Sequence, residues 1–149
     1  MTCCFTGHRV ILGDIEELKQ KISETVDMLI SEGVTRFVSG GALGFDTIAA
    51  EVIIEKRKEK DIFLEIAVPC LNQESKWNSK QQARYKKILA SADAVTVLSP
   101  KYVTGCMHAR NKYMVDKSQI VVSYYRGRSG GTQATFLYAQ EMDKQIINL

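Results

Sequence analysis

The chain has 149 residues, of which 45% are hydrophobic, and its 20 basic and 17 acidic side chains give a net charge of +3. This length supports one sizeable core, so we expect a single domain over residues 1–149. The weak charge falls short of the basic stripe of a dedicated nucleic-acid-binding protein, and no apolar run approaches the roughly 20 residues that span a bilayer. Because Met1–Gly7 is too short for a signal-peptide core, we expect a cytoplasmic protein that binds no membrane.

The four cysteines stand at positions 3, 4, 70 and 106. A secreted disulfide framework would need denser cysteines and a targeting segment, so we expect reduced thiols. The first two fall in an apolar run and are expected to be buried, whereas Cys70 and Cys106 are expected to be more exposed. No C-x-x-C or H-x-x-x-H spacing joins them to His8 or His108, so no metal site is predicted.

Short apolar runs rich in β-branched residues alternate with amphipathic segments along the whole chain. They predict strands over Cys3–Phe5, Val34–Val38, Ile62–Val68, Ala94–Leu98 and Ile120–Tyr124, and Ile146–Leu149 is compatible with a short sixth strand. Helices are predicted over Ile15–Glu32, Leu43–Lys58, Asn72–Ser91, within Met107–Lys117, and over Thr132–Lys144. The first helix has a capping box at Asp14 and Glu17 and a stop signal at Gly33.

This alternation predicts a mainly parallel sheet, and right-handed crossovers then give a doubly wound, Rossmann-like three-layer α/β/α sandwich. In such a sheet, all loops that follow strands lie at one edge. The loops returning to strands are ordinary charged turns, whereas the loops leaving them hold most of the glycines, both histidines and several arginines. We therefore expect the functional site at the carboxyl edge.

Two glycine-rich segments at this edge each join a strand to a helix. Ser39–Asp46 contains Gly40, Gly41 and Gly44, and a second segment runs through Gly130, Gly131 and Thr132. Glycines at a helix start let backbone N–H groups approach a phosphate at the positive end of the helix dipole. The alternative interpretation is a tight turn that needs the positive φ angles of glycine. Asp46 is either a carboxylate favoured by the helix dipole or an acceptor for a ribose hydroxyl.

Three well-known motifs are missing. The sequence has no Gly-x-x-x-x-Gly-Lys-Ser/Thr, no Gly-x-Gly-x-x-Gly after the first strand and no Gly-x-Ser-x-Gly. A P-loop NTPase and an α/β-hydrolase are therefore disfavoured.

Five segments of the chain match a known family: Cys4–Arg9, Ser39–Asp46, Ala49–Glu51, Arg110–Asp116 and Gly130–Thr132. Together they resemble the YpsA-like branch of the SLOG superfamily, which is named for the SMF/DprA and LOG proteins. The resemblance covers nearly the whole chain. It implies a Rossmann-like sheet with central strand order 3-2-1-4-5, a nucleotide-derived ligand and self-association, with a dimer as the expected oligomer. NAD-related molecules and ADP-ribose are among the ligands proposed for such proteins.

The LOG branch contains phosphoribohydrolases whose Gly-Gly-x-Gly-Thr-x-x-Glu segment supplies a glutamate to the chemistry. Aligning the Gly-Thr step with Gly131-Thr132 places Thr135 where that glutamate would stand. A hydroxyl cannot stabilise an oxocarbenium ion by charge. The resemblance therefore puts inherited glycosidase activity in doubt, with Glu51 and Asp46 left as weak candidates for a catalytic carboxylate.

The leading hypothesis is a module that binds or senses a nucleotide-derived ligand, such as a mononucleotide or an NAD- or ADP-ribose-like molecule. Its predicted contacts are Gly7, His8, Arg9, Ser39, Gly40, Gly41, Gly44, Asp46, Arg110, Asn111, Gly130, Gly131 and Thr132. Arginine suits phosphate through paired hydrogen bonds, and neutral histidine can still donate one. The structural alternatives stay open: Arg110 as a surface ion-pair partner, His8 as a loop anchor and Asn111 as a helix cap.

Two other functions remain. One is an enzyme that cleaves or transfers at a nucleotide glycosidic bond. The other is a single-stranded DNA binder like the DprA relatives, which would need a basic groove with exposed aromatic residues and is disfavoured by the weak net charge.

Overall fold

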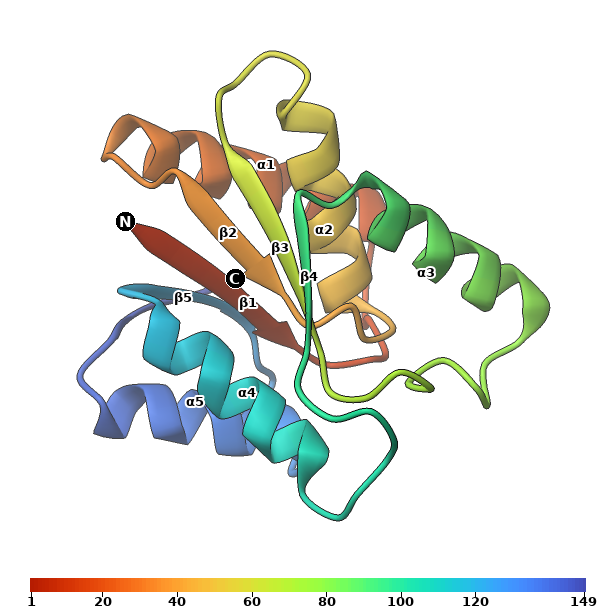
Figure 1. Cartoon of the computed structure of the whole chain (residues 1–149). Helices are drawn as coiled ribbons and strands as arrows, with labels where there is room; N and C mark the ends of the chain where they lie inside the picture. Colours follow the sequence, from red (N-terminus) through yellow and green to blue (C-terminus); the bar gives the residue numbers. More distant parts are fainter.

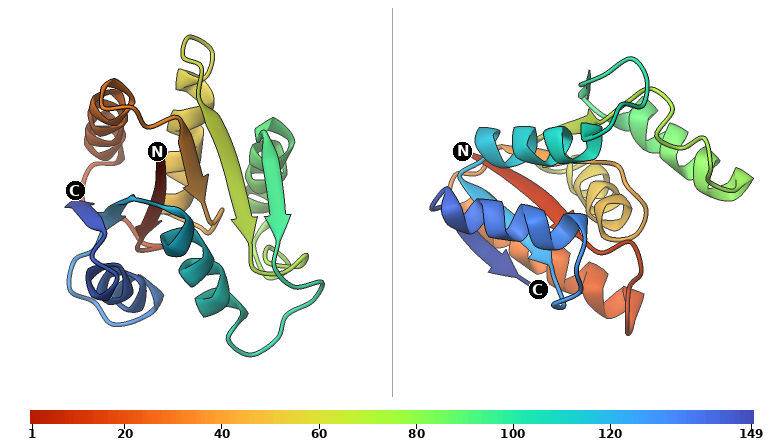
Figure 2. Two further views of the ribbon diagram at one scale, coloured as in Figure 1. Left: turned by 60° about the vertical axis from the view of Figure 1, so that its left-hand side comes forward. Right: turned by 90° about the horizontal axis from the view of Figure 1, so that it is seen from below.

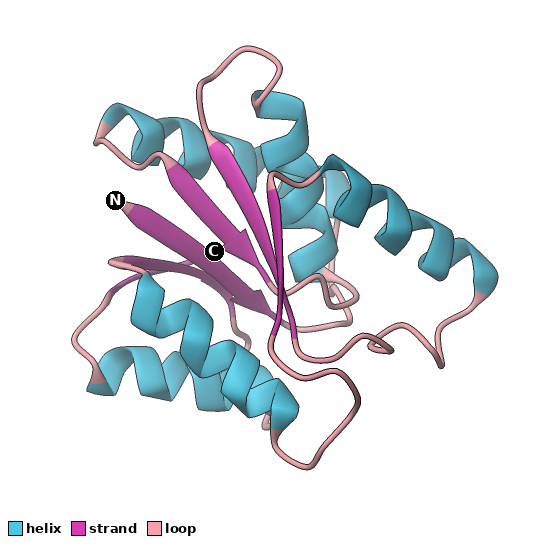
Figure 3. Cartoon of the chain, viewed as in Figure 1, coloured by secondary structure: helices cyan, strands magenta, loops and turns pink.

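The computed structural model describes all residues from 1 to 149, which form one six-stranded sheet with five helices (Figures 1 and 3). Every adjacent pair of strands is parallel, so the predicted Rossmann-like α/β fold is confirmed. In chain order the elements are β1 Thr2–Gly7, α1 Ile15–Ser31, β2 Arg36–Ser39, α2 Phe45–Lys56, β3 Phe63–Val68, α3 Ser79–Ser91, β4 Ala94–Val97, α4 Cys106–Lys117, β5 Ile120–Tyr124, α5 Gly131–Glu141 and β6 Gln145–Asn148.

The strand order is β4-β3-β2-β1-β5-β6. The expected order 3-2-1-4-5 is therefore wrong for the fourth strand, because β5 and not β4 lies beside β1. The apolar run Ile120–Tyr124 suits a central position, where every residue of it is buried, whereas at the edge Val95 and Val97 of β4 stay 43% and 39% exposed. At this edge, β4 is tied to β3 by the Asp93 carboxylate, which accepts the Leu64 N–H at 2.8 Å.

The helices divide between the two faces of the sheet. The first three crossovers run in one direction and place α1, α2 and α3 on one face, whereas α4 and α5 lie side by side on the other (Figures 1 and 2). The larger core, with Phe5, Phe37 and Phe45, lies under the first group, and a smaller core around Met114 and Val121 lies under the second. The direction of winding reverses between β1 and β5, where an α/β sheet opens a crevice at its carboxyl edge.

The helix starts show how the sequence sets these elements. Asp14 caps α1 by accepting the Glu16 N–H at 2.8 Å. The third helix begins at Ser79 rather than Asn72, because Asn78 and Gln81 form a capping box there. Residues 71–77 instead form turns, within which Gln73 is buried.

Two expectations about the cysteines need correction. Cys70 and Cys106 are only 1% and 4% exposed, and neither is a surface thiol. Cys70 follows β3 and is covered by the turn segment, while Cys106 begins α4 and faces inward. All four cysteines are free thiols, as predicted. None of the helices combines the length and the apolar character needed to cross a membrane.

Candidate functional site

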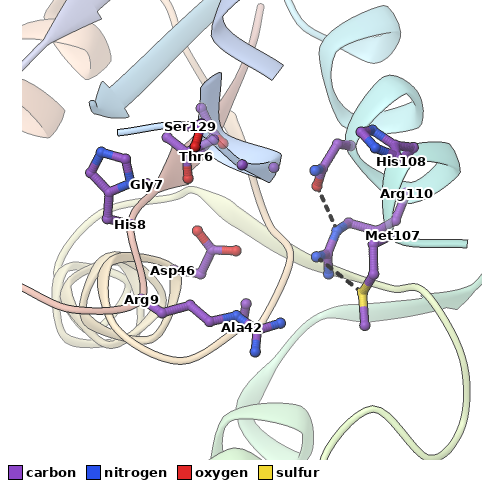
Figure 4. Close-up of a pocket in the computed structure, with 14 residues that line it drawn as sticks. Thr6, Gly7, His8, Arg9, Ala42, Asp46, Met107, His108, Arg110 and Ser129 are labelled. Atoms are coloured by element: carbon purple, nitrogen blue, oxygen red, sulfur yellow. Dashed lines mark hydrogen bonds between the residues drawn. The ribbon is translucent and has the colours of Figure 1, made fainter. Parts of the chain in front are cut away.

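A cavity of about 440 Å³ opens at the carboxyl ends of β1 and β5, at the reversal of the winding (Figure 4). Four segments line it: the end of β1, the start of α2, the first turns of α4 and the loop into α5. Nine of the thirteen predicted contact residues lie on its wall: Gly7, His8, Arg9, Asp46, Arg110, Asn111, Gly130, Gly131 and Thr132. The fold thus brings most of the predicted site together, and ligand contact by these residues stays a prediction.

Asp46 provides the one carboxylate of this cavity and is only 5% exposed. Burial raises the pKa of Asp46 to about 6, although the positive charges of Arg110 and Arg9 and the backbone N–H of Ala42 pull it down. Its Oδ1 atom is buried and has no hydrogen-bond partner. Figure 4 shows the carboxylate between His8 on one side and Arg110 on the other. A buried carboxylate oxygen without a partner is costly, so Oδ1 of Asp46 can accept a hydrogen bond from a ligand.

Arg110 reaches the cavity from α4 and is 4% exposed, so it is not the surface ion-pair partner of the alternative interpretation. Its Nη1 donates to the Gly40 carbonyl at 2.7 Å and to Gln73 Oε1 at 3.2 Å, and its Nε donates to Asn111 Oδ1 at 2.8 Å. Nη2 contacts only the sulfur of Met107, at 3.9 Å. Burial lowers the pKa of Arg110, but an arginine stays charged, so this group supplies a fixed cation.

His8 joins the end of β1 to the loop that follows β5. Its Nε2 accepts the backbone N–H of Arg126 at 2.9 Å, so the ring proton lies on Nδ1. Burial lowers the pKa of His8, and the nearby charges of Arg128 and Arg126 lower it further, so the ring is neutral at pH 7. His8 therefore anchors a loop, as the structural alternative expected, and it also lines the cavity.

The helix starts around the cavity differ from those elsewhere. The N-cap residues of α2, α4 and α5 are Gly44, Gly105 and Gly130, and none provides a capping side chain, whereas Asp14 and Asn78 cap α1 and α3. Because Gly130 has no capping side chain, the N–H groups in the first turn of α5 have no side-chain acceptor. This turn begins with Gly131 and Thr132, which line the cavity. An anion can satisfy those groups and is favoured by the helix dipole.

Four predicted contact residues do not line the cavity: Ser39, Gly40, Gly41 and Gly44. Ser39 is fully buried, and its hydroxyl donates to the Asp46 carbonyl at 2.9 Å and accepts the Gly41 N–H at 3.2 Å. Gly41 has a φ of +67°, and a Cβ there would lie 3.1 Å from Tyr85. A Cβ at Gly44 would lie 2.2 Å from the Arg9 carbonyl oxygen. These glycines are explained by turn geometry and close packing, the second interpretation offered above.

Glu51 lies away from the cavity. Its carboxylate forms a two-point ion pair with Arg84 of α3, in which Arg84 Nε donates to Oε2 at 2.8 Å. It therefore joins α2 to α3 as a structural partner. Thr135 is 3% exposed, and its hydroxyl donates to the Gly131 carbonyl at 2.8 Å.

Sequence reasoning missed five lining residues: Thr6, Ala42, Met107, His108 and Ser129. Thr6, Ala42 and Ser129 belong to the loops sorted to this edge, so a signal for them existed. Met107 and His108 precede Arg110 on one helix turn, and only the placement of α4 over the reversal of the sheet shows that they matter. Gln73, behind the wall, had no signal in the sequence.

A family comparison agrees with this architecture. The YpsA model, described as the YspA SLOG family, matches residues 12–147, which is nearly the whole chain. The chain belongs to the YpsA family of SLOG proteins. The family resemblance predicted from the sequence is therefore confirmed.

Curated YpsA-like relatives share about a third of the residues. The SPbeta prophage-derived protein YoqJ of Bacillus subtilis strain 168 is 34% identical over 139 residues, which cover 84% of this chain and 81% of YoqJ. A UPF0398 protein of Halalkalibacterium halodurans is 31% identical over 134 residues, covering 88% of this chain and 71% of the relative.

Solved structures with the same fold include DNA processing protein A. The Helicobacter pylori protein, known for its single-stranded DNA binding mode, gives a TM-score of 0.71 at 21% identity, covering 98% of this chain and 63% of that one. The Streptococcus pneumoniae protein gives a TM-score of 0.70 at 18% identity, covering 97% of this chain and 48% of that one. The chain thus spans less than two thirds of each, and the similarity shows a shared fold.

Proposed function

We propose that this YpsA-family protein binds a nucleotide-derived ligand, with a phosphate at the start of α5 and a ribose hydroxyl on Asp46. The observation that carries the proposal is the unpartnered, buried Oδ1 atom of Asp46 in the same cavity as the start of α5, which has no side-chain cap. The Asp46 oxygen needs a hydrogen-bond donor, and the first-turn N–H groups of α5 need an anion. A sugar phosphate supplies both within one molecule.

The charges around the cavity support an anionic ligand. Arg9 and Arg110 line the wall, while Asp46 is the only acidic side chain on it. Nη2 of Arg110, whose one contact is the weak acceptor sulfur of Met107, can donate to a phosphate oxygen, and such charge-assisted hydrogen bonds are strong. The neutral His8 offers an Nδ1–H donor without adding charge.

Gly131 gives an independent argument. Its φ is not positive, and a Cβ there would meet only Asn111 Nδ2, at an ordinary 3.8 Å. Neither backbone conformation nor packing therefore requires glycine at this position. Close approach of a ligand to the backbone does explain the glycine.

The test is a thermal-shift screen with mononucleotides, cyclic nucleotides, NAD and ADP-ribose, because a ligand at 100 times its dissociation constant stabilises by about 2.7 kcal/mol. The Gly131→Val variant should stay folded and lose the shift. Gln140→Val is the matched control, since Gln140 is exposed on the same helix and lines no part of the cavity. A flat screen, or a Gly131→Val protein that binds like the wild type, would refute the proposal. We also propose that the protein forms a dimer, and native mass spectrometry of the same samples tests this.

Cleavage of a nucleotide glycosidic bond is the second candidate, and one observation favours it. Asp46, with its pKa of about 6, is a cavity carboxyl that can hold or release a proton near neutral pH. Glu51 cannot take this role because it pairs with Arg84 outside the cavity.

A further inference from the structure

A groove of about 430 Å³ adjoins the cavity on the outer side of α4 and α5. His108 and Asn111 line both the groove and the cavity. From there the groove continues between α4, which contributes Lys112, and α5, which contributes Ala134, Leu137 and Tyr138. The two helices that enclose it lie side by side (Figure 2). The shared residues make the groove a continuation of the candidate site.

The two spaces differ in chemistry. Only Ala42 and Met107 are hydrophobic on the cavity wall, and the wall has no aromatic ring large enough to cover a base. The groove presents the side chain of Leu137 and the ring of Tyr138, with Lys112 Nζ over that ring and Glu141 also on the wall. A nucleobase is flat and largely apolar on its faces, and it gains most from lying against such a surface.

The Tyr138 ring is held in place by α4. Its hydroxyl donates to Asp116 Oδ1 at 2.6 Å, and Lys112 Nζ lies 5.1 Å from the ring centre. A fixed aromatic ring loses little conformational freedom when a ligand packs on it.

Asn111 lines both the cavity and the groove, and Gly131 lies beside it on the cavity wall. A Cβ at Gly131 would have Asn111 Nδ2 as its nearest neighbour, at 3.8 Å. Because Asn111 Oδ1 is occupied by Arg110 Nε, the amide nitrogen is the end left to donate to a ligand that passes between them.

We propose that the groove between α4 and α5 is the base subsite of the ligand whose phosphate and ribose occupy the cavity. The inference rests on the proposed function and goes beyond it by placing the base outside the polar cavity, next to Tyr138. The occupant is a nucleoside monophosphate or a larger molecule built on one.

The experiment compares AMP, GMP, CMP and UMP with ribose 5-phosphate, which lacks a base, by titration calorimetry. Ala134→Trp fills the groove, and Leu137→Asp gives its wall a charge; Leu137 is 53% exposed, so the fold tolerates the change. Gln140→Trp on the same helix is the control outside the groove. The wild type should bind the preferred monophosphate at least about tenfold more tightly than ribose 5-phosphate. Both groove variants should lose that preference while their affinity for ribose 5-phosphate is retained.

The possible failures are distinct. If the wild type binds neither kind of probe, the proposed function fails, and the subsite fails with it. If ribose 5-phosphate binds and the groove variants keep the preference for a base, or lose both probes equally, the subsite alone is refuted. A change of oligomeric state in Leu137→Asp, measured by analytical ultracentrifugation, would also overturn it, because the groove would then be an interface between copies.

Discussion

Asp46 and Arg110 are both buried on one cavity wall, yet they do not form an ion pair. Arg110 directs Nη1 to the Gly40 carbonyl and to Gln73, while Asp46 Oδ1 stays without any partner. The two charges still influence each other, since Arg110 lowers the pKa of Asp46 and Asp46 raises that of Arg110, in both cases against the larger effect of burial. Perturbed pKa values of this kind cluster at functional sites.

The first prediction concerns Asp46→Asn. Burial raises the pKa of Asp46 from 3.8 to about 6, so the folded protein binds a proton that the unfolded chain releases between these values. The stability contributed by that proton is fully present below pH 3.8 and is lost as the pH rises to about 6. At 1.36 kcal/mol per pKa unit, ionised Asp46 costs the native state about 3 kcal/mol at neutral pH. Asp46→Asn should therefore raise the free energy of unfolding at pH 7.5, in urea titrations, and weaken ligand binding.

The control for this prediction is Asp93→Asn, whose effect on stability should have the opposite sign. Although burial opposes it, hydrogen bonding to the Leu64 N–H and pairing with Arg57 hold the pKa of Asp93 below its usual value. Its contribution is present above pH 3.8 and is lost as the pH falls through the folded pKa, so Asp93→Asn destabilises at pH 7.5. A destabilised Asp46→Asn protein at this pH would contradict the assignment.

The second prediction concerns Gly41→Val. The sequence alone predicts a folded protein that no longer binds ligand. The φ of +67° and the 3.1 Å approach to Ile66 and Tyr85 change that expectation. A β-branched residue there should cost about 1–3 kcal/mol or more of stability, because it rarely adopts this conformation. Thermal unfolding with and without ligand separates the two outcomes, and an unchanged Tm with lost binding would restore the earlier interpretation.

The third prediction concerns Gln73, which holds Arg110 from behind the cavity wall. Its amide nitrogen donates to the Gly40 carbonyl at 3.3 Å and to the Tyr85 hydroxyl at 3.2 Å, while its oxygen accepts from Arg110. Gln73→Leu should weaken binding of a phosphate-bearing ligand by about tenfold, because one buried hydrogen bond is worth about 1 kcal/mol and the guanidinium loses its orientation.

Gln82→Leu is the matched control for Gln73→Leu. The Gln82 amide donates to the Glu74 and Trp77 carbonyls in the same region, without touching Arg110. Calorimetry should show wild-type affinity for Gln82→Leu. Equal losses in the two variants would mean that the turn segment, and not Gln73, holds the site.

The fourth prediction is that the wild-type protein releases no appreciable free base from nucleoside monophosphates and that Thr135→Glu does not create this activity. Thr135 is buried and bonded to the Gly131 carbonyl, so a glutamate there would bury a charge and disturb the start of α5. Chromatography of reaction mixtures checks this. Free base that disappears in Asp46→Asn, but persists in Glu51→Gln, would establish the glycosidase candidate with Asp46 as its carboxylate.

The sequence by itself determined the class of fold and the edge of the sheet at which the candidate cavity lies. An apolar run rich in β-branched residues and a 3.6-residue apolar period are local patterns, so Ile120–Tyr124 is recognisable as a strand and Ile15–Ser31 as a helix without any tertiary information. Parallel β-α units then require all strand-following loops to share an edge, which is why Gly7, Asp46 and Gly131 could be grouped in advance.

Only the tertiary structure decided which glycines line the cavity, which strands are neighbours and which polar groups lack partners. Gly41 and Gly131 are alike in sequence, but a Cβ at Gly41 would lie 3.1 Å from Tyr85, whereas a Cβ at Gly131 would meet only Asn111 Nδ2, at an ordinary 3.8 Å. Likewise, Glu51 and Asp46 both lie on α2, yet Arg84 forms an ion pair with Glu51 and not with Asp46. These differences depend on contacts between residues far apart in the chain, and such contacts cannot be predicted from local sequence patterns.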